Sequence, residues 1–297
     1  MIRLSRWLSL PLAAAIVLSG CQSLNAVNPA KPEKLTTEQV LQKADAASEK
    51  AKGYTYKVNG DQTLTVEADG QSHSVDQTVQ MDMELLNHPR SIHYKGQLEN
   101  NGQTLKMEAY QVGKEIYQTP DGITWAKSEG LDLDQIAGGQ TQNPSKALQK
   151  VQELLSKLES DKNKPLSMKE TGKSYLVKLN VTDKTNKQVQ DMFLKQLTAA
   201  LAPGLKQSGL TVDLDQVKLD KLVQTYTIDK KSFEQKKMVQ EMELQIPVSD
   251  GTSSGTIRVT QTMTLKNTGE FKGTIEVPQH VKGTAQEVRP EDIAPQQ

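Results

Sequence analysis

The thiol of Cys21 is the side chain whose position most directly predicts a specific chemical event. It is the only cysteine among 297 residues, which excludes a disulfide framework and every multi-cysteine zinc or iron–sulfur site. Two small residues, Ser19 and Gly20, precede it directly. A solitary thiol after small residues is accessible to a membrane-embedded transferase, so this arrangement favours modification of the sulfur.

Residues 1–20 have the organisation of a secretory signal peptide. Arg3 and Arg6 form a short positive region, and an apolar run follows over residues 7–18. A basic start, an apolar run and small residues at the cleavage site are typical of such peptides. The run is shorter than the roughly 20 apolar residues that a membrane-spanning helix needs. Cleavage before Cys21 would leave 34 basic and 36 acidic residues, a net charge of −2.

The string Leu18-Ser19-Gly20-Cys21 resembles the lipobox of bacterial lipoproteins. The resemblance implies that Cys21 receives a diacylglycerol on its sulfur and becomes the first residue of the mature chain. Two acyl chains satisfy the requirement for stable anchoring. The alternative is an ordinary signal peptide with a free cysteine near its cut. We expect the anchored form, held on the extracytoplasmic face of the cell membrane, with residues 21–35 forming the lipidated cysteine and a flexible tether.

The other polar residues form no recognisable catalytic or metal-binding pattern. The sequence contains no G-x-S-x-G, P-loop or G-x-G-x-x-G motif. His88 and His93 lie five positions apart across an expected turn, without a companion histidine or a fixed helical spacing. Acidic pairs in residues 132–134 and 213–215 lack the glycine and later glutamate of a calcium loop. We therefore expect no enzyme activity, no metal and no cofactor.

Composition and charge exclude a further class of function. The 36 Lys and Arg residues are balanced by 36 Asp and Glu residues, so the chain lacks the basic excess of nucleic-acid-binding proteins. Only 35% of the residues are hydrophobic, whereas roughly 45–50% is typical with glycine included. The core therefore contains few hydrophobic residues, or it forms around another molecule. Four tyrosines could line a sugar site, although strand amphipathicity is the commoner explanation: Tyr54, Tyr56, Tyr110 and Tyr117.

Hydrophobic periodicity predicts one helix followed by a run of strands. Thr36 and Gln39 have the spacing of a capping box, and apolar residues follow at helical spacing. We expect this helix to end at Gly53, which tolerates positive φ. Residues 54–127 then alternate as a meander of strands, most clearly over Thr78 to Leu85.

The second half of the chain alternates between helical and strand patterns. Helices are expected in residues 143–158 and 184–202, with a strand over 174–181 between them. No long Gly/Ser linker divides the chain, so we predict one α+β domain over residues 36–283. Residues 284–297 are expected to form a loose tail.

Nine apolar residues occupy alternate positions of the expected strands. Several are methionines, whose flexible, polarizable side chains suit surfaces that accept several apolar shapes. One hypothesis is a curved sheet whose concave face holds acyl chains, and the alternative is ordinary packing between sheet and helices. The predicted ligand-facing residues are Val79, Met81, Met83, Leu85, Met107, Met242, Leu244, Ile257 and Met263.

The overall pattern resembles the LolA-like lipoproteins, most closely the LppX/LprG-type branch and its uncharacterised Firmicutes relatives. The resemblance covers roughly residues 36–283. It rests on patterns of strands and turns, without an invariant catalytic signature, at residues 54–56, 115–117, 124–127, 227–231 and 275–278. It implies a curved antiparallel sheet forming a half-open β-barrel, with helices packed in its mouth and an apolar cavity that carries lipids or lipoglycans. The low aromatic content, 4%, departs from the usual rich apolar pocket.

Two functional hypotheses follow from these residues and this resemblance. The first is a monomeric, lipid-anchored, non-catalytic protein that binds a lipid or another hydrophobic molecule. The second is a structural, docking or envelope-sensing lipoprotein with a filled core and no ligand. The sequence identifies neither the ligand nor a protein partner.

Overall fold

The structure is a computed structural model, and it describes residues 34–119, 121–129, 165–195, 197, 210–212, 216–249, 251 and 253–288. Cys21, most of its tether, the helix expected over 143–158 and both acidic pairs lie outside these residues. The described chain continues to residue 288, beyond the expected domain boundary at residue 283.

Strands make up most of the described chain. The elements are α1 (Thr37–Lys50), β1 (Gly53–Ala68), β2 (Gln71–Leu86), β3 (Ser91–Asn100), β4 (Gln103–Val112), β5 (Glu115–Thr119), β6 (Ala126–Glu129), β7 (Leu166–Glu170), β8 (Ser174–Thr182), β9 (Thr211–Val212), β10 (Lys218–Asp229), β11 (Gln235–Ser249), β12 (Ser254–Glu270), α5 (Gln279–Thr284) and β13 (Gln286–Glu287). A further helical stretch begins at residue 187, within the helix expected over residues 184–202.

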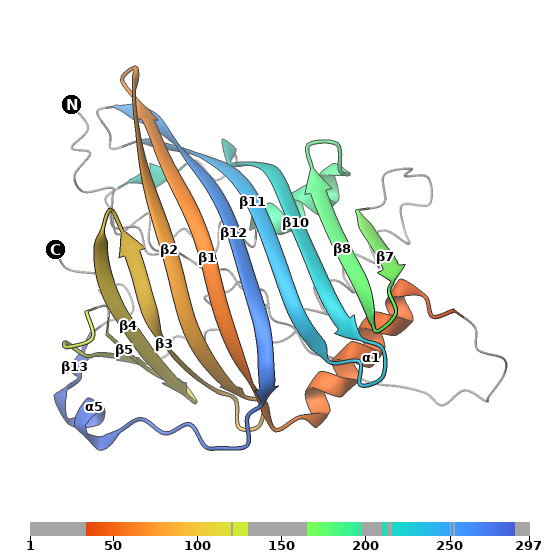
Figure 1. Cartoon of the computed structure of the whole chain (residues 1–297). Coiled ribbons are helices and arrows are strands. Elements are labelled where there is room, and N and C mark those ends of the chain that lie inside the picture. Colours follow the sequence, from red (N-terminus) through yellow and green to blue (C-terminus); the bar gives the residue numbers. More distant parts are fainter. Residues whose placement is uncertain are drawn as a thin grey trace.

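The strands form one curved, unclosed sheet (Figure 1). Their order is β13-β6-β5-β4-β3-β2-β1-β12-β11-β10-β8-β7, and β9 adds to β11. All the pairs are antiparallel except β13 with β6. Since β7 and β13 lie at opposite edges, the described strands form no closed barrel. The expected fold class, a half-open antiparallel barrel, is confirmed.

The alternation of side chains gives the sheet two chemically different faces. In β1, Val58 and Leu64 are buried, whereas Lys57 and Asp61, at the alternate positions of the strand, are exposed. Successive strand residues point to opposite faces, and the cross-strand register continues each set across the neighbouring strands. We call the face carrying Val58 and Leu64 the inner face, and the face carrying Lys57 and Asp61 the outer face.

Helices cover part of the inner face. The expected capping box at the start of α1 is present, because Thr36 and Gln39 each accept from the other's backbone N–H. Val40 of α1 and Phe193 of the helical stretch from residue 187 join the same buried cluster as the inner-face residues. Within the described residues, no helix is both long and apolar enough to cross a membrane.

The sequence suggested that Gly53 ends α1 with a positive φ, and this expectation is wrong. The helix ends at Lys50, and Gly53 is the first residue of β1. A Cβ atom on Gly53 would lie 2.1 Å from the carbonyl oxygen of Leu85. The position therefore requires glycine because β1 and β2 approach closely there, not because of its backbone dihedral angle.

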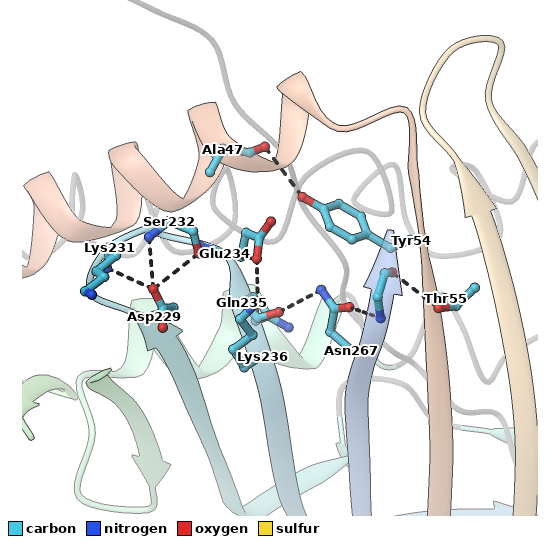
Figure 2. A network of polar contacts seen from close by, with 11 residues as sticks. Ala47, Tyr54, Thr55, Asp229, Lys231, Ser232, Glu234, Gln235, Lys236 and Asn267 are labelled. Carbon is cyan, nitrogen blue, oxygen red and sulfur yellow. Dashed lines mark hydrogen bonds and ion pairs between the residues drawn. The ribbon is translucent and has the colours of Figure 1, made fainter. Parts of the chain in front are cut away.

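Polar contacts hold α1 against one end of the sheet (Figure 2). The hydroxyl of Tyr54 in β1 donates to the carbonyl of Ala47 in α1 at 3.5 Å, and burial raises the pKa of Tyr54 to about 12. Nearby, Asp229 Oδ1 accepts from the backbone N–H groups of Lys231 and Ser232 at 2.8 and 2.9 Å. These bonds fix the β10–β11 turn beside the helix.

The C-terminal segment packs on the outer face of the sheet. A separate buried cluster joins Tyr117 and Trp125 with Val277 and Val281. Tyr117 pairs with Lys127 on the outer face, and β13 extends the edge by pairing with β6. In the part of the chain that the structure describes, the segment after β12 therefore covers the outer face near β4–β6, whereas α1 and the helical stretch from residue 187 pack on the inner face.

Candidate functional site

All nine predicted ligand-facing residues lie on the inner face. Val79 pairs through Gly60 with Met263, and Met83 and Leu85 follow at alternate positions of β2. Across the remaining strands, register places Met81 opposite Gly96, and Gly96 opposite Met107. Met242, Leu244 and Ile257 complete the set on β11 and β12.

The inner face has a closed region and a more open region. Seven of the nine residues are buried, for example Leu244 with 1% and Met263 with 1% of their surface exposed. By contrast, Met81 and Met107 are only partly buried. Leu105, next to Met107 on the same face of β4, is 43% exposed. The inner face of β2–β4 therefore presents apolar side chains to solvent.

A row of buried glutamines crosses the apolar inner face. Gln77, Gln62, Gln261, Gln240 and Gln224 lie on the adjacent strands β2, β1, β12, β11 and β10, and each has 2–7% of its surface exposed. We call this set the glutamine ladder. It crosses the same face as the methionines, since Gln62 lies two residues from Gly60, which pairs with Met263.

Hydrogen bonds connect the glutamine ladder in one direction. The amide nitrogen of each residue donates to the amide oxygen of the next: Gln224 to Gln240 at 2.7 Å, Gln240 to Gln261 at 3.4 Å, Gln261 to Gln62 at 3.2 Å and Gln62 to Gln77 at 3.3 Å. The hydroxyl of Tyr226 donates to Gln224 at 2.8 Å and starts the row. Burial raises the pKa of Tyr226 above its ordinary value, so this hydroxyl remains a donor.

The ladder leaves hydrogen-bonding capacity unused. A primary amide has two N–H donors and an oxygen with two lone pairs. Within the described chain, Gln62, Gln224, Gln240 and Gln261 each donate once and accept once. A buried donor without a partner costs about 1–3 kcal/mol. The inner face therefore contains polar groups that a bound molecule could satisfy.

His93 lies on the outer face, between two carboxylates. Its ring nitrogens are 3.0 Å from Glu84 and 3.1 Å from Glu108, and its ring stacks on Tyr110 at 4.3 Å. Burial raises the pKa of Glu108, but hydrogen bonds from Tyr110 and His93 outweigh it and lower the pKa overall. Among the described residues, no group of three His, Cys, Asp or Glu side chains is arranged to hold a metal.

The four tyrosines of the possible sugar site are divided between the two faces. Tyr54 and Tyr56 belong to the inner-face cluster, whereas Tyr110 and Tyr117 pack with the cluster on the outer face. They therefore do not line one common site.

The glutamine ladder was missed in the sequence because its members look like interruptions. Gln261 breaks the apolar alternation between Val259 and Met263, and Gln62 and Gln77 do the same in their own strands. These glutamines occupy the alternate strand positions that also carry the apolar residues, which indicates that they share the inner face. Their alignment with one another, however, depends on the register between strands far apart in the chain.

A scan against protein families matches residues 36–286 to a family of unknown function, DUF6612. The chain belongs to this family. A search of curated proteins finds no match.

Three solved structures show a loose likeness to this fold. A β-barrel-like DUF1849 protein from Brucella abortus is 9% identical, with a TM-score of 0.21 over 74% of this chain and 100% of that chain. A DUF1329 protein from Desulfovibrio piger is 7% identical, with a TM-score of 0.24 over 79% and 93%. A LolA superfamily protein from Nitrosomonas europaea is 10% identical, with a TM-score of 0.21 over 84% and 97%.

Proposed function

We propose that this protein is a non-catalytic, lipid-anchored carrier that binds a lipid or another apolar molecule against the inner face of its open sheet. The observation that carries the proposal is the partly exposed apolar surface of Met81, Leu105 and Met107, continuous with the buried inner face. Exposed apolar surface inside a curved sheet gains free energy when a hydrophobic ligand covers it. Membership of the LppX/LprG-type branch of LolA-like lipoproteins is part of this proposal.

A charge on this apolar surface tests the binding role. We expect Met107→Glu to weaken binding of the neutral fluorophore N-phenyl-1-naphthylamine about tenfold, because a carboxylate beside the ligand must be desolvated. The matched control is Lys106→Glu, which places the same carboxylate on the exposed outer face of β4. Fluorescence titration of the chain from residue 22 onward measures both. Equal affinities in the two variants would contradict binding at this surface.

The anchor is proposed from Cys21 and is tested separately. In a bacterial host that processes lipoproteins, we expect Cys21→Ala to release the protein from the membrane fraction or to stall removal of residues 1–20. Fractionation followed by intact-mass measurement distinguishes the two results. A fully processed Cys21→Ala chain that stays in the membrane fraction would refute lipidation as the anchor.

A filled-core docking or envelope-sensing lipoprotein is the second candidate. The burial of seven of the nine predicted residues favours it, because side chains packed against helices leave a ligand less to cover. Recovery of a specific protein partner together with a ligand-free inner face would support this candidate over the carrier.

A further inference from the structure

We propose that the glutamine ladder binds the uncharged ester oxygens of an acylglycerol whose chains lie on the apolar inner face. This inference rests on the proposed carrier function and specifies its ligand class. The ladder is defined by Gln77, Gln62, Gln261, Gln240 and Gln224, aligned across five adjacent strands.

The ladder orients donors away from the sheet. A planar amide that donates sideways to the next strand has its second N–H directed along the side chain, away from the backbone of the sheet. Four of the amides donate only once within the described chain. Neighbouring strands lie about 4.8 Å apart, so adjacent donors can each reach a different carbonyl oxygen of one acylglycerol.

The neighbours of the ladder favour an uncharged ligand. Leu64 and Val259 lie in the pair of positions on one side of Gln62 and Gln261, and Gly60 and Met263 in the pair on the other. These residues are apolar and provide no cation to neutralise a phosphate or carboxylate. A buried charge without a partner is strongly disfavoured, whereas an ester carbonyl needs only the N–H that the ladder offers.

The flanking apolar rows would hold the acyl chains. Val75 and Val79 continue the two rows on β2, and both are buried. The partly exposed Met81 lies on the same face of the same strand and leads toward the open region of β2–β4. The inner face thus places a polar band between two apolar bands, so acyl chains that extend to either side of the glycerol esters would each lie on an apolar row.

Competition between an acylglycerol and a hydrocarbon of similar chain length tests the ladder. The chain from residue 22 onward is loaded with N-phenyl-1-naphthylamine, which is then displaced with monoolein or with the hydrocarbon 1-octadecene. We expect monoolein to compete at about tenfold lower concentration in the wild-type protein. Gln261→Met and Gln62→Met should each remove this preference and leave 1-octadecene displacement within about twofold. Thr262→Val, which changes the exposed outer face beside Gln261, should retain it.

Two outcomes separate this inference from the carrier function. If both competitors displace the fluorophore equally from the wild-type protein, or if the Gln→Met variants keep the preference, the ladder does not bind the ester and the carrier function stands. If neither competitor displaces a bound fluorophore, or none binds, both proposals fail.

A readout on the unmodified protein covers the case in which a glutamine variant fails to fold. Heteronuclear NMR of the labelled wild-type chain resolves side-chain amide groups. Monoolein should shift the signals of Gln62, Gln240 and Gln261, whereas 1-octadecene should shift them much less. Unchanged glutamine signals under saturating monoolein would overturn the inference.

Discussion

At the scale of single residues, Gly53 sets how closely the first two strands approach. Its missing side chain lets the carbonyl oxygen of Leu85 come within 2.1 Å of the place where a Cβ would stand. The phenolic oxygen of the next residue, Tyr54, bonds α1 at Ala47. Gly53 therefore permits the close pairing of β1 with β2, directly beside the residue that bonds α1.

Replacing this glycine should be costly. We expect Gly53→Ala to lower the free energy of unfolding by about 2–3 kcal/mol, because the backbone of β2 must move to accommodate the methyl group. Urea unfolding followed by circular dichroism measures the change. In the control Gly172→Ala, a Cβ meets nothing within 4 Å, so stability should stay equal or rise by up to about 1 kcal/mol. Equal stabilities of the two variants would contradict the close approach.

At the scale of the elements, the strand alternation and the N-terminal cap of α1 were predictable because they depend on neighbours in sequence. Thr36 and Gln39 are three residues apart and form their capping box as expected. The strand Thr78 to Leu85 lies within β2 as expected.

Features that depend on distant strands were not predictable in the same way. The requirement for glycine at position 53 arises from β2, which is more than 30 residues away at Leu85. The glutamine ladder joins Gln62 to Gln261, 199 residues apart. A period of two assigns each glutamine to a face, but it does not tell which residue lies opposite it.

At the scale of the whole molecule, the sheet remains open, and its two faces have different roles. The C-terminal segment covers the outer face near Tyr117 and Trp125, whereas α1 and the helical stretch from residue 187 cover part of the inner face. The remaining inner surface at β2–β4 exposes Leu105. With the proposed anchor at Cys21, this opening would lie near a bilayer from which a lipid could be transferred.

Native mass spectrometry of the chain from residue 22 onward, before and after organic extraction, tests the carrier function most directly. We predict a discrete additional mass that disappears on extraction and fragments as a lipid. A second sample, stripped of ligand and incubated with dispersed monoolein, should regain one such mass. A ligand-free mass in both samples, with the protein folded by circular dichroism, would contradict the carrier function and favour the docking lipoprotein with a filled core.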